Sequence, residues 1–214
     1  MILFVVGIIV IFVLFIIVFS NNDKTFQKEA GCRGEKLATN IIKSVLEEGD
    51  YLYTNVSISY NGKKTELDNV VVNKYGVFIF EVKNYNGKLI GEEDDYTWKK
   101  YKDDGYGNIF VKEVKNPIKQ VKRQIYILAR YLNNFNVWVE GYAIILYAKG
   151  NIKSEYLIKD VKNIDKAIHS FKKNRLSKHT VVSIGKALEK SLKRNHFLNK
   201  CNNVHWKSIE YAFS

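Results

Sequence analysis

The chain has 214 residues, with 34 Lys and Arg against 22 Asp and Glu, one Pro, two Cys and 46% hydrophobic residues. This composition excludes collagen-like, disulfide-scaffold and mostly disordered chains, and it predicts a packed core. The formal net charge of +12 is typical of a protein with an anionic partner, either nucleic acid or an anionic membrane surface.

The charge is distributed unevenly along the chain. Residues 1–20 carry no charged side chain, and residues 21–148 carry 19 basic and 17 acidic side chains. Residues 149–214 carry 15 basic and 5 acidic side chains, a net charge of +10. We therefore expect a transmembrane helix at residues 1–20, a near-neutral domain at 21–150 and a basic helical C-terminal extension at 151–214.

Residues 1–19 form an unbroken apolar run that would span roughly 28 Å as a helix, close to the thickness of a bilayer core. A cleaved secretory signal is the alternative. It is disfavoured because no Lys or Arg precedes the run and no Ala-x-Ala-like site follows it at residues 18–21. The sequence therefore predicts an uncleaved membrane anchor.

The charges beside this anchor predict its orientation. Basic residues follow the apolar run, at Lys24, Lys28, Arg33 and Lys36, whereas only the terminal amine precedes it. We therefore expect a single-pass protein of the cell membrane whose soluble domain faces the cytoplasm. The two isolated cysteines lack metal-ligand spacing and agree with a reducing compartment.

The soluble part begins with a helical pattern over residues 24–48, which Gly49-Asp50 ends. Glu35 lies at the edge of the apolar stripe of this helix, within about 60° of its nearest members. Its carboxylate is therefore expected to point toward the core side. The stripe consists of Ala38, Ile41, Ile42, Val45 and Leu46.

A meander of short strands is predicted next. The strands are expected at residues 55–60, 65–73, 76–83 and 88–91, with turns at 61–62 and 84–87. Residues 103–108 have the composition of a loop.

Asn116-Pro117 is a favourable helix start, with Asn as the cap and Pro at the first position. A buried strand at 137–148 and helices at 163–173 and 178–194 complete the pattern. The chain is thus predicted to contain one α/β domain.

Acidic side chains on two neighbouring strands are the strongest chemical signal. If residues 73–76 form a tight hairpin turn, Asp68 lies opposite Glu81, with Cβ atoms roughly 5 Å apart. Two facing carboxylates repel each other, and a hard divalent cation such as Mg²⁺ or Mn²⁺ converts that repulsion into ligation. Lys83 shares the face of Glu81 and could orient a water or balance phosphate charge.

Ordinary structural roles remain open for each of these residues. The same register places Glu66 opposite Lys83, so Lys83 could belong to a cross-strand ion pair. Glu35 could simply support the first turn of its helix through the helix dipole. Gln120, near a helix N-terminus, could be a surface residue.

Several separated motifs occur in order along residues 31–149. They are Gly31-Cys32-Arg33-Gly34-Glu35, Asp68, Glu81-Val82-Lys83-Asn84, Gly87, Gly91, Trp98 and Asn116-Pro117-Ile118-Lys119-Gln120. In this order they resemble the nuclease-related domain (NERD) family, which by resemblance belongs to the PD-(D/E)XK nuclease-like superfamily. The superfamily's Pro-Asp pair is absent, because Leu67 precedes Asp68, and the family tolerates that difference.

The resemblance implies a restriction-endonuclease-like fold, in which helices flank a mixed sheet. It also implies that Glu35, Asp68, Glu81, Lys83 and Gln120 gather around one metal site. Asp68 and Glu81 would hold Mg²⁺ or Mn²⁺, with Glu35 as a further ligand or water acceptor. Lys83 would position the attacking water, and Gln120 would orient that water or Lys83.

The leading hypothesis is therefore a membrane-anchored, metal-dependent nuclease, with DNA expected as substrate rather than RNA. Basic residues would attract the polyanion, both in the C-terminal third and near Gln120, where they are Lys119, Lys122 and Arg123. The alternative is a catalytically inactive module of the same fold that binds nucleic acid or protein at the membrane. Residues 151–214 could also contact anionic lipid, although we expect the apolar stripe of residues 178–194 to dock on the domain.

Overall fold

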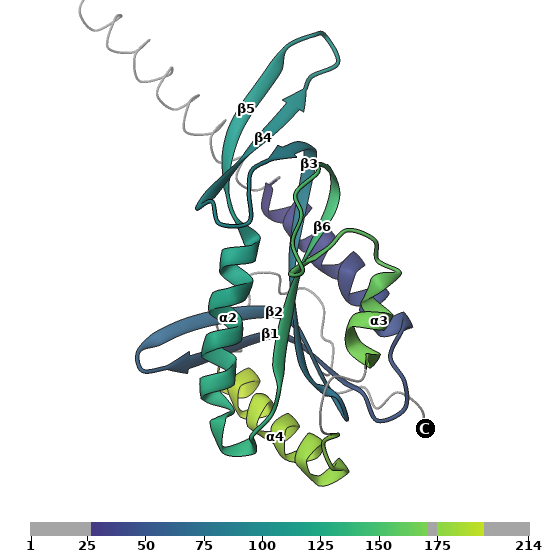
Figure 1. Cartoon of the computed structure of the whole chain (residues 1–214), viewed down its shortest axis with the longest axis vertical. Helices are drawn as coiled ribbons and strands as arrows, with labels where there is room; N and C mark the ends of the chain where they lie inside the picture. The colour runs from purple at the N-terminus through teal and green to yellow at the C-terminus, as the bar shows by residue number, and fades with distance from the viewer. Residues whose placement is uncertain (1–26, 171–174, 195–214) are drawn as a thin grey trace, which may run out of the picture.

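The computed structural model describes residues 27–170 and 175–194 (Figure 1). At its centre is a seven-stranded sheet in which β1 to β5 are neighbours in sequence order. β6 pairs in parallel with β3, and β7 pairs in parallel with β6. The strands are β1 (Tyr51–Tyr60), β2 (Lys63–Asn73), β3 (Gly76–Ile90), β4 (Thr97–Asp103), β5 (Ile109–Lys115), β6 (Val139–Lys149) and β7 (Leu157–Ile158).

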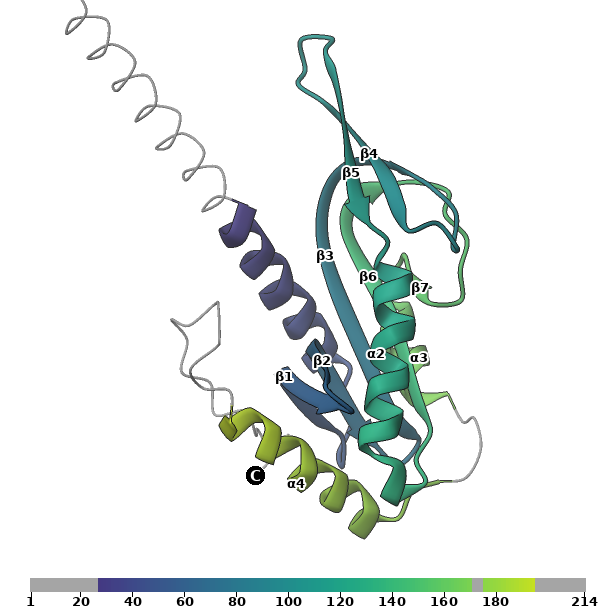
Figure 2. The same cartoon turned by 90° about the vertical axis from the view of Figure 1, so that its left-hand side faces the viewer.

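Helices cover both faces of this sheet, as Figure 2 shows. On one face, α2 (Pro117–Tyr131) and α4 (Lys178–Arg194) share a core with Val70 and Ile79. On the other face, the helix of residues 27–44 and α3 (Asn163–His169) pack against Val71 and Phe80. A short 3₁₀ helix, η1 (Asn133–Phe135), follows α2. The expected α/β fold, a mixed sheet flanked by helices, is confirmed.

The transmembrane helix expected at residues 1–20 lies outside the described residues. Within residues 27–170 and 175–194, no helix is both long enough and apolar enough to cross a bilayer. The expected cytoplasmic orientation rests on the flanking charges.

The predicted register of the β2–β3 hairpin is correct. Asn73 pairs with Gly76, and the ladder continues to Asn69 and Phe80, one step before the expected pair of Asp68 and Glu81. The predicted Asn61-Gly62 turn is also confirmed, because both residues have positive φ angles, of 47° and 74°.

The turn expected at residues 84–87 is wrong, because β3 runs unbroken through this segment to Ile90. Gly87 marks a close approach of β4 instead: a β-carbon there would lie 2.0 Å from the carbonyl oxygen of Tyr101. Its φ of 102° also favours glycine. The pairing of β3 with β6 shifts between Asn84 and Gly87, so the glycine permits an irregularity within one long strand.

Two further elements differ from expectation. β4 and β5 form a hairpin whose strands the sequence did not predict, and residues 104–108 connect them. The helix expected at 163–173 ends at His169, because Ser170 adopts an extended conformation with ψ of 123°.

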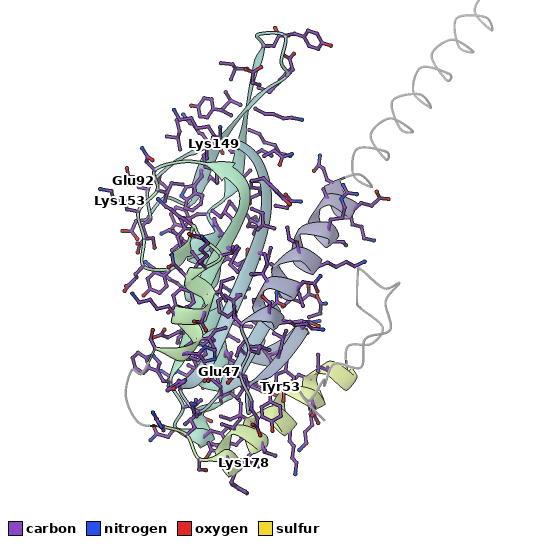
Figure 3. All side chains as sticks on the ribbon, turned by 90° about the vertical axis from the view of Figure 1, so that its right-hand side faces the viewer. Glu47, Tyr53, Glu92, Lys149, Lys153 and Lys178 are labelled. Carbon is purple, nitrogen blue, oxygen red and sulfur yellow. The ribbon has the colours of Figure 1, made fainter. Side chains whose placement is uncertain are left out.

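α4 docks on the domain, as expected. Val181, Ile184 and Leu188 on its apolar stripe are buried in the same cluster as Tyr53 of β1, and Tyr53 lies beside this helix in Figure 3. The stripe is therefore used for packing and is not available to insert into lipid.

A half-buried histidine connects α3 to the start of the sheet. His169 Nε2 lies 2.7 Å from Asp50 Oδ2, and its Nδ1 lies 2.6 Å from Asp165 Oδ1. Burial disfavours the charged ring, but the hydrogen bonds to Asp50 and Asp165 outweigh burial and raise the pKa of His169 above 6.5. The imidazolium therefore stabilises the fold at low pH.

We predict that this contribution disappears as pH rises. A raised pKa means that the stabilisation is complete below about pH 6.5 and is lost as pH increases through the pKa of the folded state. Urea unfolding at pH 5.5 and 8.5 tests this for His169→Gln. The substitution should cost about 1–2 kcal/mol at pH 5.5 and clearly less at pH 8.5. An equal cost at both pH values would contradict the prediction.

Candidate functional site

Asp68 lies where the pairing of β2 is interrupted on both sides. Toward β3, the ladder ends at the pair of Asn69 and Phe80. Toward β1, the pairs on either side of Asp68 are kept, but the residue between them, Asn55, has a left-handed φ of 53° and is not paired. Asp68 Oδ2 instead accepts a hydrogen bond of 2.8 Å from the backbone N–H of Val82. The side chain thus replaces a strand partner.

Glu81 is the buried centre of the site, with 1% of its surface exposed. Lys83 Nζ donates to its Oε1, and Gln124 Nε2 of α2 donates to its Oε2 at 2.6 Å. The same amide donates to the carbonyl of Glu66 at 3.0 Å. Because both partners of Nε2 are acceptors, the orientation of the Gln124 amide is fixed. Both oxygens of the Glu81 carboxylate are therefore held.

The environment favours the protonated form of Asp68. Burial and the adjacent Glu81 carboxylate, with a smaller contribution from Glu35, raise the pKa of Asp68 to about 8. The hydrogen bond from Val82 and the charge of Lys83 oppose this shift but do not cancel it. Burial also raises the pKa of Glu35, assisted by Glu81. With Glu35, Asp68 and Glu81 all ionised, the site would hold more negative charge than Lys83 neutralises.

Lys83 supplies the positive charge at the centre of the site. Burial works against its ammonium group, but Glu81 and Asp68 outweigh burial and raise its pKa. The alternative cross-strand partner, Glu66, makes no described ion pair with Lys83, because the β2–β3 ladder ends before these positions.

Glu35 lies on the helix of residues 27–44, which packs on the face of the sheet opposite α2. The preceding Gly34 is packed so closely on β3 that a β-carbon there would lie 2.7 Å from Cβ of Asn84. Asn84 Nδ2 also donates to the carbonyl of Ala30 at 2.7 Å. One helical turn after Glu35, Thr39 donates to its carbonyl and lies 2.8 Å from Asn69 Oδ1. These contacts fix the part of the helix that carries Glu35.

The glutamine that contacts the Glu81 carboxylate is Gln124, which the sequence interpretation missed. Gln120, the expected residue, lies one turn earlier on the same helix. Its side chain makes no described contact with Glu81 or Lys83. Helical spacing from Gln120 could have identified Gln124 as a second candidate, because residues i and i+4 share a face.

The helix α2 begins as predicted. Asn116 Oδ1 accepts from the N–H of Ile118 at 2.8 Å, and Pro117 occupies the first turn. Of the three basic residues expected near the site, Lys122 is paired with Glu93 at 2.5 Å. Arg123 donates to the carbonyl of Lys64, and Lys119 lies 4.6 Å from the ring centroid of Tyr96.

The described residues contain no group of three or more His, Cys, Asp or Glu side chains arranged to hold a metal ion. Asp68 and Glu81 nevertheless offer carboxylate oxygens, the donors that Mg²⁺ and Mn²⁺ prefer. A carboxylate whose charge is suppressed by a neighbouring carboxylate is also a group that a cation would stabilise. The donor set therefore suits a divalent cation in chemistry and charge.

We predict that removing the Gln124 amide destabilises the domain. Gln124→Leu leaves Glu81 Oε2 and the Glu66 carbonyl without their buried donor, which should cost about 1–3 kcal/mol of unfolding free energy. Gln120→Leu on the same helix face is the matched control and should cost less than about 0.5 kcal/mol. Urea unfolding measures both, and equal losses would contradict the assignment.

Comparison with known proteins gives a family for this site. The nuclease-related domain family, NERD, matches residues 30–146. An uncharacterised protein of Bacillus anthracis is 33% identical over 76 residues, which cover 35% of this chain and 36% of that relative. No solved structure matches the chain. Because the family match covers more than half of the sequence and includes Glu35, Asp68, Glu81 and Lys83, the chain belongs to the NERD family, within the PD-(D/E)XK nuclease-like superfamily.

Proposed function

We propose that the chain hydrolyses phosphodiester bonds of nucleic acid at the site of Asp68, Glu81 and Lys83. The observation that carries this proposal is a buried Glu81 carboxylate, with the half-buried Asp68 and a lysine beside it, at an interruption of the sheet. Opposing carboxylates beside a lysine are costly as a purely structural arrangement. Their accumulation in a nuclease-related domain is typical of a reactive site.

A divalent metal, Mg²⁺ or Mn²⁺, is part of this proposal. Asp68 and Glu81 would hold it, and Glu35 would act as a further ligand or accept a hydrogen bond from water. Bound there, the cation would supply an ionised water and positive charge beside the phosphoryl oxygens. The supporting observation is the elevated pKa of Asp68, which burial and then the adjacent Glu81 carboxylate cause, because a positive charge close by would stabilise the ionised form of both carboxyl groups.

The protein groups would position the reactants. Lys83 would hold the attacking water and balance charge on the phosphate, and Gln124 would keep the Glu81 carboxylate in a fixed orientation through its 2.6 Å hydrogen bond. Gln120, one turn before Gln124 on α2, would orient the attacking water or Lys83.

A nucleic-acid-binding module without catalysis is the second candidate. It is favoured by the lack of a three-ligand metal group among the described residues. In that case the chain would bind nucleic acid in a salt-sensitive manner but would not take up a divalent metal.

We predict that Asp68→Asn separates function from stability. In the folded parent the Asp68 carboxyl has a pKa of about 8, whereas in the unfolded chain it ionises near pH 3.8. Folding is therefore opposed increasingly as pH rises between those values. The variant should be more stable than the parent by about 1 kcal/mol or more at pH 8, and equally stable near pH 4. It should also lose Mn²⁺-dependent cleavage of a labelled oligonucleotide.

Glu66→Gln is the control, because it makes the same charge change two residues earlier at an exposed position. This control should cleave at the parental rate, and Mn²⁺ should raise the Tm of the control and the parent but not that of Asp68→Asn. Parental cleavage by Asp68→Asn would refute the catalytic assignment. A parent that binds nucleic acid but neither binds Mn²⁺ nor cleaves would support the binding module.

We also propose that the apolar residues 1–20 anchor the chain in the cell membrane, with the domain on the cytoplasmic side. The support is the uncharged apolar run and the basic residues that follow it. We predict that the full chain resists alkaline extraction from membranes and that a chain lacking residues 2–20 is released. A reporter fused after Ser214 should be active inside the cell. Activity outside would reverse the proposed orientation.

A further inference from the structure

The β4–β5 hairpin projects beyond the body of the domain (Figure 1). Its seven strand pairs run from Thr97 and Lys115 at the base to Asp103 and Ile109 near the tip. Successive side chains of a strand point to opposite faces, and directly paired residues share a face. The register therefore divides the hairpin into two faces of different composition.

The first face, which we call the lysine face, carries Lys100, Lys102, Lys112 and Phe110 beyond its buried base. It has no acidic strand residue. The opposite face balances its charges, because Lys99 is paired with Glu113 and because Lys115 and Asp103 lie at its two ends. Positive charge on the hairpin is therefore segregated to one side.

The lysine face is electrostatically unfavourable for the isolated protein. Lys100 is directly opposite Lys112, and neither these two nor Lys102 forms a salt bridge with any described residue. Burial, followed by the charges of Lys112 and Lys102, lowers the pKa of Lys100. Like charges directly opposite each other destabilise a strand pair, so an anion bound here would relieve a real cost.

The same face leads to the carboxylate site. Lys100 Nζ lies 5.6 Å from the ring centroid of Tyr85 on β3. Tyr85 is two residues beyond Lys83 on β3. Burial raises the pKa of Tyr85, the charge of Lys83 opposes this rise and the charge of Glu81 adds to it. Glu81, Lys83, Tyr85 and Lys100 thus form a continuous series from the site to the hairpin.

Aromatic side chains accompany the lysines. Phe110, paired with Lys102, is 60% exposed, and Tyr106 at the hairpin tip is 92% exposed. Exposed rings beside basic residues suit unstacked bases, because each base can stack on a ring while its phosphates contact lysines. A regular duplex does not present its base faces in this way.

We propose that the lysine face of the β4–β5 hairpin binds a single-stranded segment of nucleic acid and leads it to the carboxylate site. The proposal rests on the function proposed above for that site. Phosphates would contact Lys100, Lys102 and Lys112, and a base would stack on Phe110. The hairpin thereby supplies the positive surface that a polyanion needs near repelling carboxylates.

The test is binding without metal, so that it does not depend on cleavage. The full chain, kept in mild detergent because of its apolar residues 1–19, is titrated with a fluorescent 20-nucleotide single strand in EDTA at several salt concentrations. Lys102→Gln/Lys112→Gln should weaken binding roughly 10-fold or more at 0.1 M salt and reduce the log–log salt slope by about 1.4. Phe110→Ala should weaken binding about 5-fold or more with little change in that slope.

Lys99→Gln/Lys115→Gln is the matched control, because it removes the same charge from the opposite face of the same hairpin. It should change affinity by less than about 2-fold. Equal losses in the two double variants would overturn the proposal, as would a 20-base-pair duplex that binds more tightly than the single strand. Circular dichroism of all variants identifies any loss caused by misfolding, and Phe110→Leu then serves as the gentler substitution.

Two further measurements distinguish this proposal from the proposed function and from a lipid contact. The parent should bind the single strand in EDTA whether or not it cleaves in Mn²⁺, so a parent that binds the strand through this face but does not cleave it would contradict the proposed function while leaving the hairpin proposal intact. Flotation with phosphatidylserine vesicles tests the lipid alternative. A Lys102→Gln/Lys112→Gln defect in vesicle binding, with parental single-strand binding, would overturn the proposal in favour of a lipid contact.

Discussion

An ionisable carboxylate in the middle of a sheet must be hydrogen-bonded, because burying it without partners costs several kcal/mol. Glu81 meets this requirement from two directions: Lys83 lies two residues along the same strand, and Gln124 reaches down from α2. The position of α2 is consequently coupled to the site. Its N-terminal cap at Asn116 also holds the loop after β3 through the carbonyls of Glu93 and Asp95, so the start of the helix is fixed as well.

Asp68 is less well stabilised than Glu81, because its one described hydrogen bond comes from the backbone of Val82 and its pKa is raised. The sheet gives up regular pairing on both sides of this residue, and Asn55 adopts a left-handed conformation across from it. Such distortions are unfavourable locally and persist when the surrounding structure enforces them. Here the strands on either side are tied together by Val70, Val71 and Val72, which are completely buried. The well-packed half of β2 after Asp68 thus keeps the carboxyl group in an environment that raises its pKa.

The sequence predicted those parts of the site that depend on local rules. The tight turn at residues 73–76 gave the correct register as far as Asn69 and Phe80, one step before the predicted pair of Asp68 and Glu81, and capping rules located the start of α2. Gln124 was missed because the choice between two glutamines on one helix face depends on how far α2 extends over the sheet. That distance is set by tertiary packing, which periodicity does not encode.

The β4–β5 hairpin escaped prediction for a different reason. Its strands have five lysines and few buried residues, so they lack the half-buried alternation that identifies a strand in sequence. Gly87 was likewise interpreted as part of a turn, whereas the constraint on it comes from the backbone of Tyr101, more than ten residues away. A glycine in the sequence indicates that the backbone has a special conformation or a close neighbour, but it does not identify that neighbour, which here is β4.

The docking of α4 has a consequence for the extent of the domain. The family match ends at residue 146, yet Val181, Ile184 and Leu188 fill the same hydrophobic cluster as β1 and α2, and His169 joins α3 to Asp50. The part of the chain that shares these cores is therefore longer than the segment that the family matches. α3 and α4 lie beyond that segment and complete the apolar interior of the domain.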